Sequence, residues 1–133
     1  MAEEMFTISL RVWHPTEASQ IIAQSLGLKA EFAHTAGEPR TTPKGETLEG
    51  VYKNTYITFS LLTKQPGDFT EGIKGLLPLL IHHREYFRRL SDEGGRAELF
   101  VGVFIDGGTG FTLGVGAMSA LADCLLELSV EYY

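Results

Sequence analysis

Apolar and polar residues alternate along four stretches of the chain, which is the period of a strand that buries one face. The stretches are residues 5–12, 55–62, 97–105 and 126–133. In the third stretch both sides are apolar, since Phe100 and Phe104 alternate with Leu99 and Val101. A strand with two apolar sides is typical of the middle of a sheet, so we predict that residues 97–105 form a central strand.

A helical period of 3.6 residues replaces the alternation after the first stretch. Ala18, Ile22 and Leu26 recur on one helix face. Pro15 suits the first helical position, where its missing N–H costs nothing, and Gly27 suits a left-handed C-terminal cap. We therefore predict a strand followed by a helix at the N-terminus.

A longer helical stripe starts at Asp68, where Glu71 completes a capping-box pattern, and it ends at Gly94-Gly95. Pro78 lies inside this stripe and removes one backbone donor, so we expect the helix to kink or divide there. A third, short helix is predicted over residues 117–125, with Cys124 on its apolar side as a small buried hydrophobe.

Two segments lack a clear period. Glycine and proline interrupt residues 29–54 repeatedly, so we predict an irregular loop or a mobile edge, with a functional loop as the alternative. Residues 106–110 have the composition of a turn, after which residues 111–115 are predicted to return as an antiparallel strand.

These elements predict an α+β fold in one domain spanning residues 1–133. We expect a two-layer sandwich in which helices cover one face of a mixed, largely antiparallel sheet, with ferredoxin-like elements. The other sheet face is half polar but also carries aromatic side chains, which often mark a partner surface. We predict that Phe100, Phe104 and Tyr133 contribute to an interface there, with a homodimer as one form of it.

The composition narrows the possible partners. The chain has 133 residues and a formal net charge of −6, which argues against binding nucleic acid or an anionic membrane. The N-terminus is acidic where a secretory signal is basic, and polar residues interrupt every apolar run before it reaches membrane-spanning length. With one cysteine, the chain has no internal disulfide framework, so we expect a cytoplasmic protein.

Candidate chemistry is sparse. His82 and Glu85 share a helix face and could supply two metal ligands, but we interpret them as part of a solvated face beside several arginines. The glycines of residues 106–110 lack the lysine of a phosphate-binding loop. The common hydrolase, zinc-protease and redox motifs are absent, so we predict no catalytic residue, metal or cofactor.

One pocket is possible if residues 37–50 fold over the end of the first strand. Trp13, His14, Arg40 and Tyr56 would then line a small site for an anion. The simpler interpretation is that Trp13 packs under the segment and that Arg40 pairs with a nearby carboxylate.

The chain resembles a bacterial family known only as domain of unknown function 4279. Four features carry the resemblance: Pro15 leading to Leu26-Gly27-Leu28, the turn Gly37-Glu38-Pro39-Arg40, the strand from Tyr56 to Leu62 before a long helix, and the closing segment from Leu121-Ala122 to Glu131-Tyr132. Two positions depart from the family pattern. His14 stands where an aspartate is frequent, and Tyr56 stands where tryptophan is usual. The resemblance implies no enzymatic activity and no catalytic residue.

The function expected from the sequence is therefore a non-catalytic module that binds a protein partner or itself. An immunity- or antitoxin-like role would suit a small acidic protein that masks a basic partner. The alternative is a protein or enzyme that binds a small molecule, such as an anion, in the pocket under residues 37–50.

Overall fold

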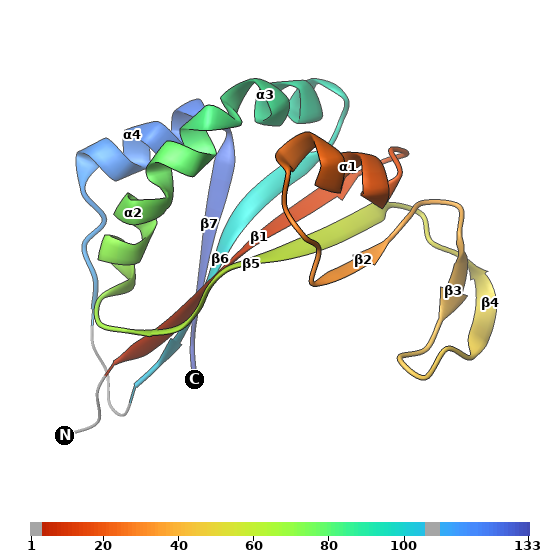
Figure 1. Cartoon of the computed structure of the whole chain (residues 1–133), viewed down its shortest axis with the longest axis horizontal. Coiled ribbons are helices and arrows are strands. Elements are labelled where there is room, and N and C mark those ends of the chain that lie inside the picture. The colour runs from red at the N-terminus through yellow and green to blue at the C-terminus, as the bar shows by residue number, and fades with distance from the viewer. Residues whose placement is uncertain (1–3, 106–109) are drawn as a thin grey trace.

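The computed structural model of the chain describes residues 4–105 and 110–133, which form a helical layer over one face of a five-stranded sheet (Figure 1). The helices are α1 (Ser19–Leu26), α2 (Phe69–His82), α3 (Arg84–Asp92) and α4 (Val115–Asp123). The strands are β1 (Met5–His14), β2 (Phe32–His34), β3 (Pro39–Thr41), β4 (Thr47–Val51), β5 (Thr55–Pro66), β6 (Arg96–Phe104) and β7 (Leu126–Tyr132). The α+β prediction is confirmed.

The main sheet has the strand order β2-β5-β1-β6-β7. Neighbouring strands are antiparallel except for β6 and β7, which run parallel. β1 is the central strand. β6 lies between β1 and β7, so it has a strand on each side, as its two apolar faces predict.

The core lies between the sheet and the helices. In β1 every second residue is buried, as the alternation predicts: Phe6, Ile8, Leu10 and Val12. Residues of β6 and of all four helices complete the core, and the principal ones are Leu99, Val101, Val103, Ile22, Ile73, Leu80, Phe87 and Leu121. Burial of these side chains is the main favourable term in folding.

Helix α1 begins at Ser19 rather than near Pro15. The preceding turn is held by His14, whose Nδ1 accepts hydrogen bonds from the backbone N–H groups of Thr16 (3.0 Å) and Glu17 (2.8 Å). These donors are therefore satisfied by a side chain before the helix starts. At the other end of α1, Gly27 has the predicted left-handed conformation (φ 64°).

The long helical stripe divides into α2 and α3, but the division falls at His83 and not at Pro78. Asp68 caps α2 by accepting a hydrogen bond from the Thr70 backbone N–H at 2.9 Å. His83 ends α2 with φ −99° and ψ 16°, and α3 then runs along the sheet (Figure 1).

The prediction of a strand over residues 111–115 is wrong. Residues 111–114 have no regular secondary structure, and α4 starts at Val115. The reason lies in the sheet, where β1 and β7 already occupy both sides of β6. The Phe111 ring packs against Phe69 of α2 instead, with ring centroids 4.8 Å apart. The predicted turn at residues 106–110 lies, apart from Gly110, outside the described residues.

The segment without a sequence pattern, residues 29–54, contains three short strands. β2 pairs with β5 and forms one edge of the main sheet. β3 and β4 pair only with each other and form a hairpin that stands beyond β2 (Figure 1).

Candidate binding surface

The face of the main sheet opposite the helices, called here the open face, is built by the residues that alternate with the core. The strand register places Trp13 of β1 beside Tyr56 of β5 and Arg96 of β6. The next row on the same face contains Arg11 and Glu98. Polar and aromatic side chains thus form continuous rows across the strands.

Aromatic rings gather where β2, β5 and β1 meet, and these rings form the aromatic cluster: Trp13, Phe32, His34, Tyr52 and Tyr56. The rings of Trp13 and Tyr56 have centroids 5.1 Å apart, and Phe32 lies 6.0 Å from both His34 and Tyr56. The guanidinium of Arg96 lies 3.8 Å from the centre of the Trp13 ring, in a cation–π contact.

A charged group occupies the middle of the open face. Arg11 Nη1 donates to Glu98 Oε1 at 3.2 Å, and Ser129 Oγ donates to Glu98 Oε2 at 3.1 Å. Glu98 is buried beneath these partners, and Arg11 also lies 3.6 Å from the centre of the Phe100 ring. The partners compensate the cost of burying the carboxylate.

At the far end of the open face, Phe104 and Tyr133 stack with centroids 4.9 Å apart and 16° between their planes. Phe104 is 38% exposed and Tyr133 is 62% exposed. The three residues predicted to form an interface therefore all lie on the open face. Phe100 is covered by Arg11, whereas the other two present apolar surface to solvent.

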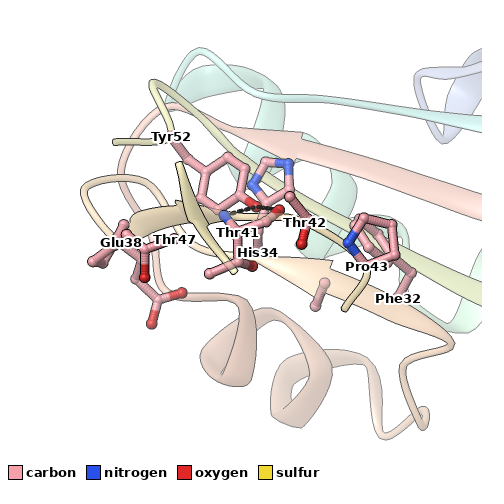
Figure 2. Close-up of a pocket in the computed structure, with 10 residues that line it drawn as sticks. Phe32, His34, Glu38, Thr41, Thr42, Pro43, Thr47 and Tyr52 are labelled. Carbon is pink, nitrogen blue, oxygen red and sulfur yellow. Dashed lines mark hydrogen bonds between the residues drawn. The ribbon is translucent and has the colours of Figure 1, made fainter. Parts of the chain in front are cut away.

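A groove of about 780 Å³ lies between β2 and the hairpin of β3 and β4. In the view of Figure 2, Phe32 and Pro43 are at one end, Glu38 and Thr47 are at the other, and the rings of His34 and Tyr52 lie between them. The residues that line it are Phe32, Ala33, His34, Glu38, Pro39, Thr41, Thr42, Pro43, Thr47 and Tyr52. A smaller hollow shares His34 with this groove and is otherwise lined by Trp13, Lys53, Asn54 and Tyr56.

His34 connects the groove to the aromatic cluster. Its ring stacks on Tyr52 with centroids 3.8 Å apart and planes within 7°. Burial lowers the pKa of His34, and this effect outweighs a hydrogen bond with the Asn54 backbone and the charge of Glu38, which both raise it. His34 is therefore neutral at pH 7.

The structure brings together only two of the four residues predicted to line a pocket. Trp13 and Tyr56 are neighbours on the open face. His14 follows Trp13 and therefore points to the helical side, where it is 5% exposed. Arg40 lies on the exposed hairpin, outside the described groove lining, and its Nη1 donates to the Glu49 carbonyl at 3.4 Å.

Sequence reasoning did not identify Phe32, His34 and Tyr52 as site residues. The spacing of two between Phe32 and His34 was a weak strand signal, but three residues are too few to establish a period. The stack of His34 on Tyr52 joins residues across two turns of the hairpin segment, which no local pattern indicates.

His14, Glu17 and Glu93 form a possible metal-binding group, with ligand atoms within 4.8 Å of one another. The donor set fits a metal poorly. Because Nδ1 of His14 accepts two backbone N–H groups, the proton is on Nε2, which donates to Glu93 Oε1 at 2.9 Å. A metal on Nε2 would require a doubly deprotonated ring, so we assign His14 to capping the turn before α1.

The other candidates from the sequence do not assemble into sites. In the part of the chain that the structure describes, His82 and Glu85 belong to no group of three possible metal ligands. Cys124 is buried as predicted, and burial raises the pKa of its thiol. None of the helices in the described residues is both long and apolar enough to cross a membrane.

Comparison with known proteins identifies a family for the chain but no individual protein that it matches. No curated protein and no solved structure matches the chain. Residues 4–133 match the family described as Domain of unknown function (DUF4279). Because this match covers nearly the whole chain, the protein belongs to the DUF4279 family.

Proposed function

We propose that this protein is a non-catalytic binding module that recognises a protein partner, or a second copy of itself, through the open face. The observation that supports this most directly is the uncovered aromatic surface at the two ends of that face. Phe32 is 54% exposed at one end, while Phe104 and Tyr133 are exposed at the other. Exposed aromatic residues with arginines beside them are the composition of protein interfaces.

The side chains between these ends are already ordered. Arg11 is fixed by Glu98 and Phe100, and Arg96 is fixed by Trp13 and Glu127. A surface whose long side chains are held in place loses less conformational entropy when a partner binds. The ion pairs therefore support binding by pre-organising the surface rather than by offering free charges.

The net charge of −6 favours a basic partner. An immunity- or antitoxin-like role in the cytoplasm, in which the protein covers a basic partner, is consistent with this charge. A homodimer formed through the same face is the second form of the proposal.

The test is to capture partners of the tagged protein from a lysate of its native host and to compare two single substitutions. Phe104→Asp places a charge on the open face, and Met118→Asp places one at a position in α4 that is 49% exposed. Circular dichroism and urea unfolding first establish that both variants are folded. Light scattering measures self-association in parallel.

We expect one stoichiometric protein, or a dimer of the chain, that is lost in Phe104→Asp and retained in Met118→Asp. Loss in Met118→Asp alone would show that binding uses the helical layer. That result would overturn the proposed function.

A second candidate is the binding of a small molecule in the groove between β2 and the hairpin. The groove volume of about 780 Å³ is in the range of ligand pockets. Its only charged lining residue among those described is Glu38, which favours a neutral or cationic ligand over an anion. A metabolite screen by thermal shift, repeated on Phe32→Ala and on Phe104→Asp, tests this candidate, because a groove ligand loses its effect in the first variant and keeps it in the second.

A further inference from the structure

The groove contains a free edge of the main sheet. β2 is the last strand in the order β2-β5-β1-β6-β7, so it pairs with β5 on one side only. All three residues of β2, Phe32, Ala33 and His34, line the groove. Within residues 4–105 and 110–133 no other backbone segment pairs with the outer side of β2. An edge of this kind presents unpaired N–H and C=O groups to an incoming chain.

The opposite wall of the groove is held at a fixed position. The Gly37 N–H donates to the Tyr52 carbonyl at 2.8 Å, and the Tyr52 N–H donates to the Glu38 carbonyl at 3.0 Å. The stack of Tyr52 on His34 then ties the base of the hairpin to β2 itself. The hairpin therefore stands beside the free edge without covering it.

The two ends of the groove differ in chemistry. Phe32 and Pro43 form an apolar end, and Glu38 carries a carboxylate at the other end (Figure 2). Glu38 Oε1 accepts a hydrogen bond from the Thr35 N–H at 3.0 Å, which orients the carboxylate. An occupant is thus expected to offer an apolar side chain to one end and a positive charge to the other.

We propose that the groove binds an extended segment of a partner polypeptide, which adds to β2 as a sixth strand of the main sheet. Backbone hydrogen bonds to β2 would supply affinity, while an apolar side chain against Phe32 and a lysine or arginine near Glu38 would supply specificity. The inference rests on the proposed function in one respect, namely that the partner is a protein.

The other free edge of the sheet is a weaker candidate. β7 contributes no residue to the groove or to the smaller hollow beside it. It carries Glu127 and Glu131, and charged side chains on an edge strand discourage pairing with another chain. β2 has no charged residue, and it has a wall beside it.

The experiment uses a phage-displayed library of random peptides, panned on the full-length protein. An enriched peptide is then synthesised and titrated into the isotope-labelled protein, and amide hydrogen exchange is followed by NMR. We expect slower exchange at the outward-facing N–H groups of β2, and a peptide that combines an apolar residue with a basic one.

Two variants give the side-chain evidence. Phe32→Ala is expected to weaken peptide binding at least tenfold, as is typical of an aromatic anchor worth ~1.4 kcal/mol or more. Glu38→Gln is expected to weaken binding and to reduce its dependence on salt. Met118→Asp is the matched control and should bind the peptide as the unmodified protein does. The exchange experiment on the unmodified protein does not depend on whether these variants fold.

Three outcomes would overturn the inference. The first is that no peptide is enriched, and the second is that peptides bind but protect amides outside β2. The third is that β2 becomes protected at high protein concentration without peptide, because the occupant is then a second copy.

The peptide and capture experiments also separate this inference from the proposed function. If peptides fail to bind while Phe104→Asp still abolishes capture of a partner, the inference fails and the proposed function stands. If peptides protect β2 while capture is insensitive to Phe104→Asp, the open-face function fails and the inference stands.

Discussion

The imidazole of His34 lies flat on the phenol ring of Tyr52, with centroids 3.8 Å apart and 7° between the planes. This stack joins the edge strand of the main sheet to the residue that directly follows β4, the second strand of the hairpin. The position of the hairpin, and with it the width of the groove, depends on this contact and on the two backbone hydrogen bonds beside it.

We therefore expect Tyr52→Ala to release the hairpin. The lost aromatic contact is worth about 0.5–1.5 kcal/mol. Amide hydrogen exchange should become faster in β3 and β4 and remain unchanged in β1 and β6. Tyr52→Phe retains the stack and loses only the weak hydrogen bonds of the hydroxyl with Thr41, so it should behave like the unmodified protein. Equal exchange rates in the alanine variant would show that the stack does not hold the hairpin.

Glu98 is the buried charge of the open face, and its removal should destabilise the fold. Glu98→Ala leaves Arg11 and Ser129 without their acceptor, so we expect a loss of about 1–3 kcal/mol in the free energy of unfolding. Urea unfolding monitored by circular dichroism measures this loss in the free energy of unfolding. Glu127→Ala, at an exposed ion pair with Arg96, is the control and should cost less than about 1 kcal/mol. Similar losses in both variants would contradict the role assigned to Glu98.

Gly95 lies where the chain enters β6 with no room for a side chain. A Cβ there would come within 2.4 Å of Leu90 Cδ1 and 2.6 Å of the Trp13 carbonyl oxygen. We expect Gly95→Ala to destabilise the protein by about 1–3 kcal/mol because the backbone of β1 must shift.

Gly75, in α2, is the opposite case, since a Cβ there meets no atom within 4 Å. Gly75→Ala should stabilise the protein by up to about 1 kcal/mol, because alanine loses less backbone entropy in a helix. Thermal unfolding of the two variants should show opposite changes in Tm. Changes of the same sign would refute the packing argument.

Stability should fall as the pH is lowered through 6.5. Burial holds the pKa of His34 below its unfolded value of 6.5, and burial followed by the charge of His82 lowers that of His83. Between the folded and the unfolded pKa values, the unfolded chain binds more protons than the folded chain. The contribution of these two residues to the free energy of unfolding is therefore complete above pH 6.5 and is lost as the pH falls below it. Urea unfolding at a series of pH values measures the slope.

His34→Phe preserves a ring against Tyr52 and removes the titrating group. We expect its free energy of unfolding to fall less steeply between pH 7 and pH 5 than that of the unmodified protein. An unchanged slope would show that His34 is protonated equally well in the folded and unfolded chains.

The alternation of apolar residues by itself identified four of the five strands of the main sheet, β1, β5, β6 and β7, and the side of each strand that faces the core. In β1 and β6 the period of two fixes which side chains enter the core, whatever the neighbours of the strand are. For the same reason Phe100, Phe104 and Tyr133 could be assigned to the face opposite the core residues before any strand order was known. The helical segments followed from their apolar stripes and from Asp68 and Gly27, but the start of α1 at Ser19 and the division at His83 did not.

Tertiary structure alone decided which strands are neighbours. Residues 111–115 have a composition suited to a strand, but β6 has only two sides, and β1 and β7 occupy them. The groove was also beyond local patterns, since β3 and β4 are exposed throughout and have no apolar period. Their pairing depends on turns, and the contact of Tyr52 with His34 joins two segments that no local pattern relates.

His14 shows the same limit at a single residue. Strand alternation, which is a local property, turns Trp13 and His14 to opposite faces and excludes the shared pocket, but only the tertiary structure brings His14 to Glu93, 79 residues away in sequence. The sequence determines the face of a strand or helix to which a side chain points, because this depends only on the local repeat of the backbone. It does not reveal the partner of that side chain, because partners are brought together by packing between distant segments.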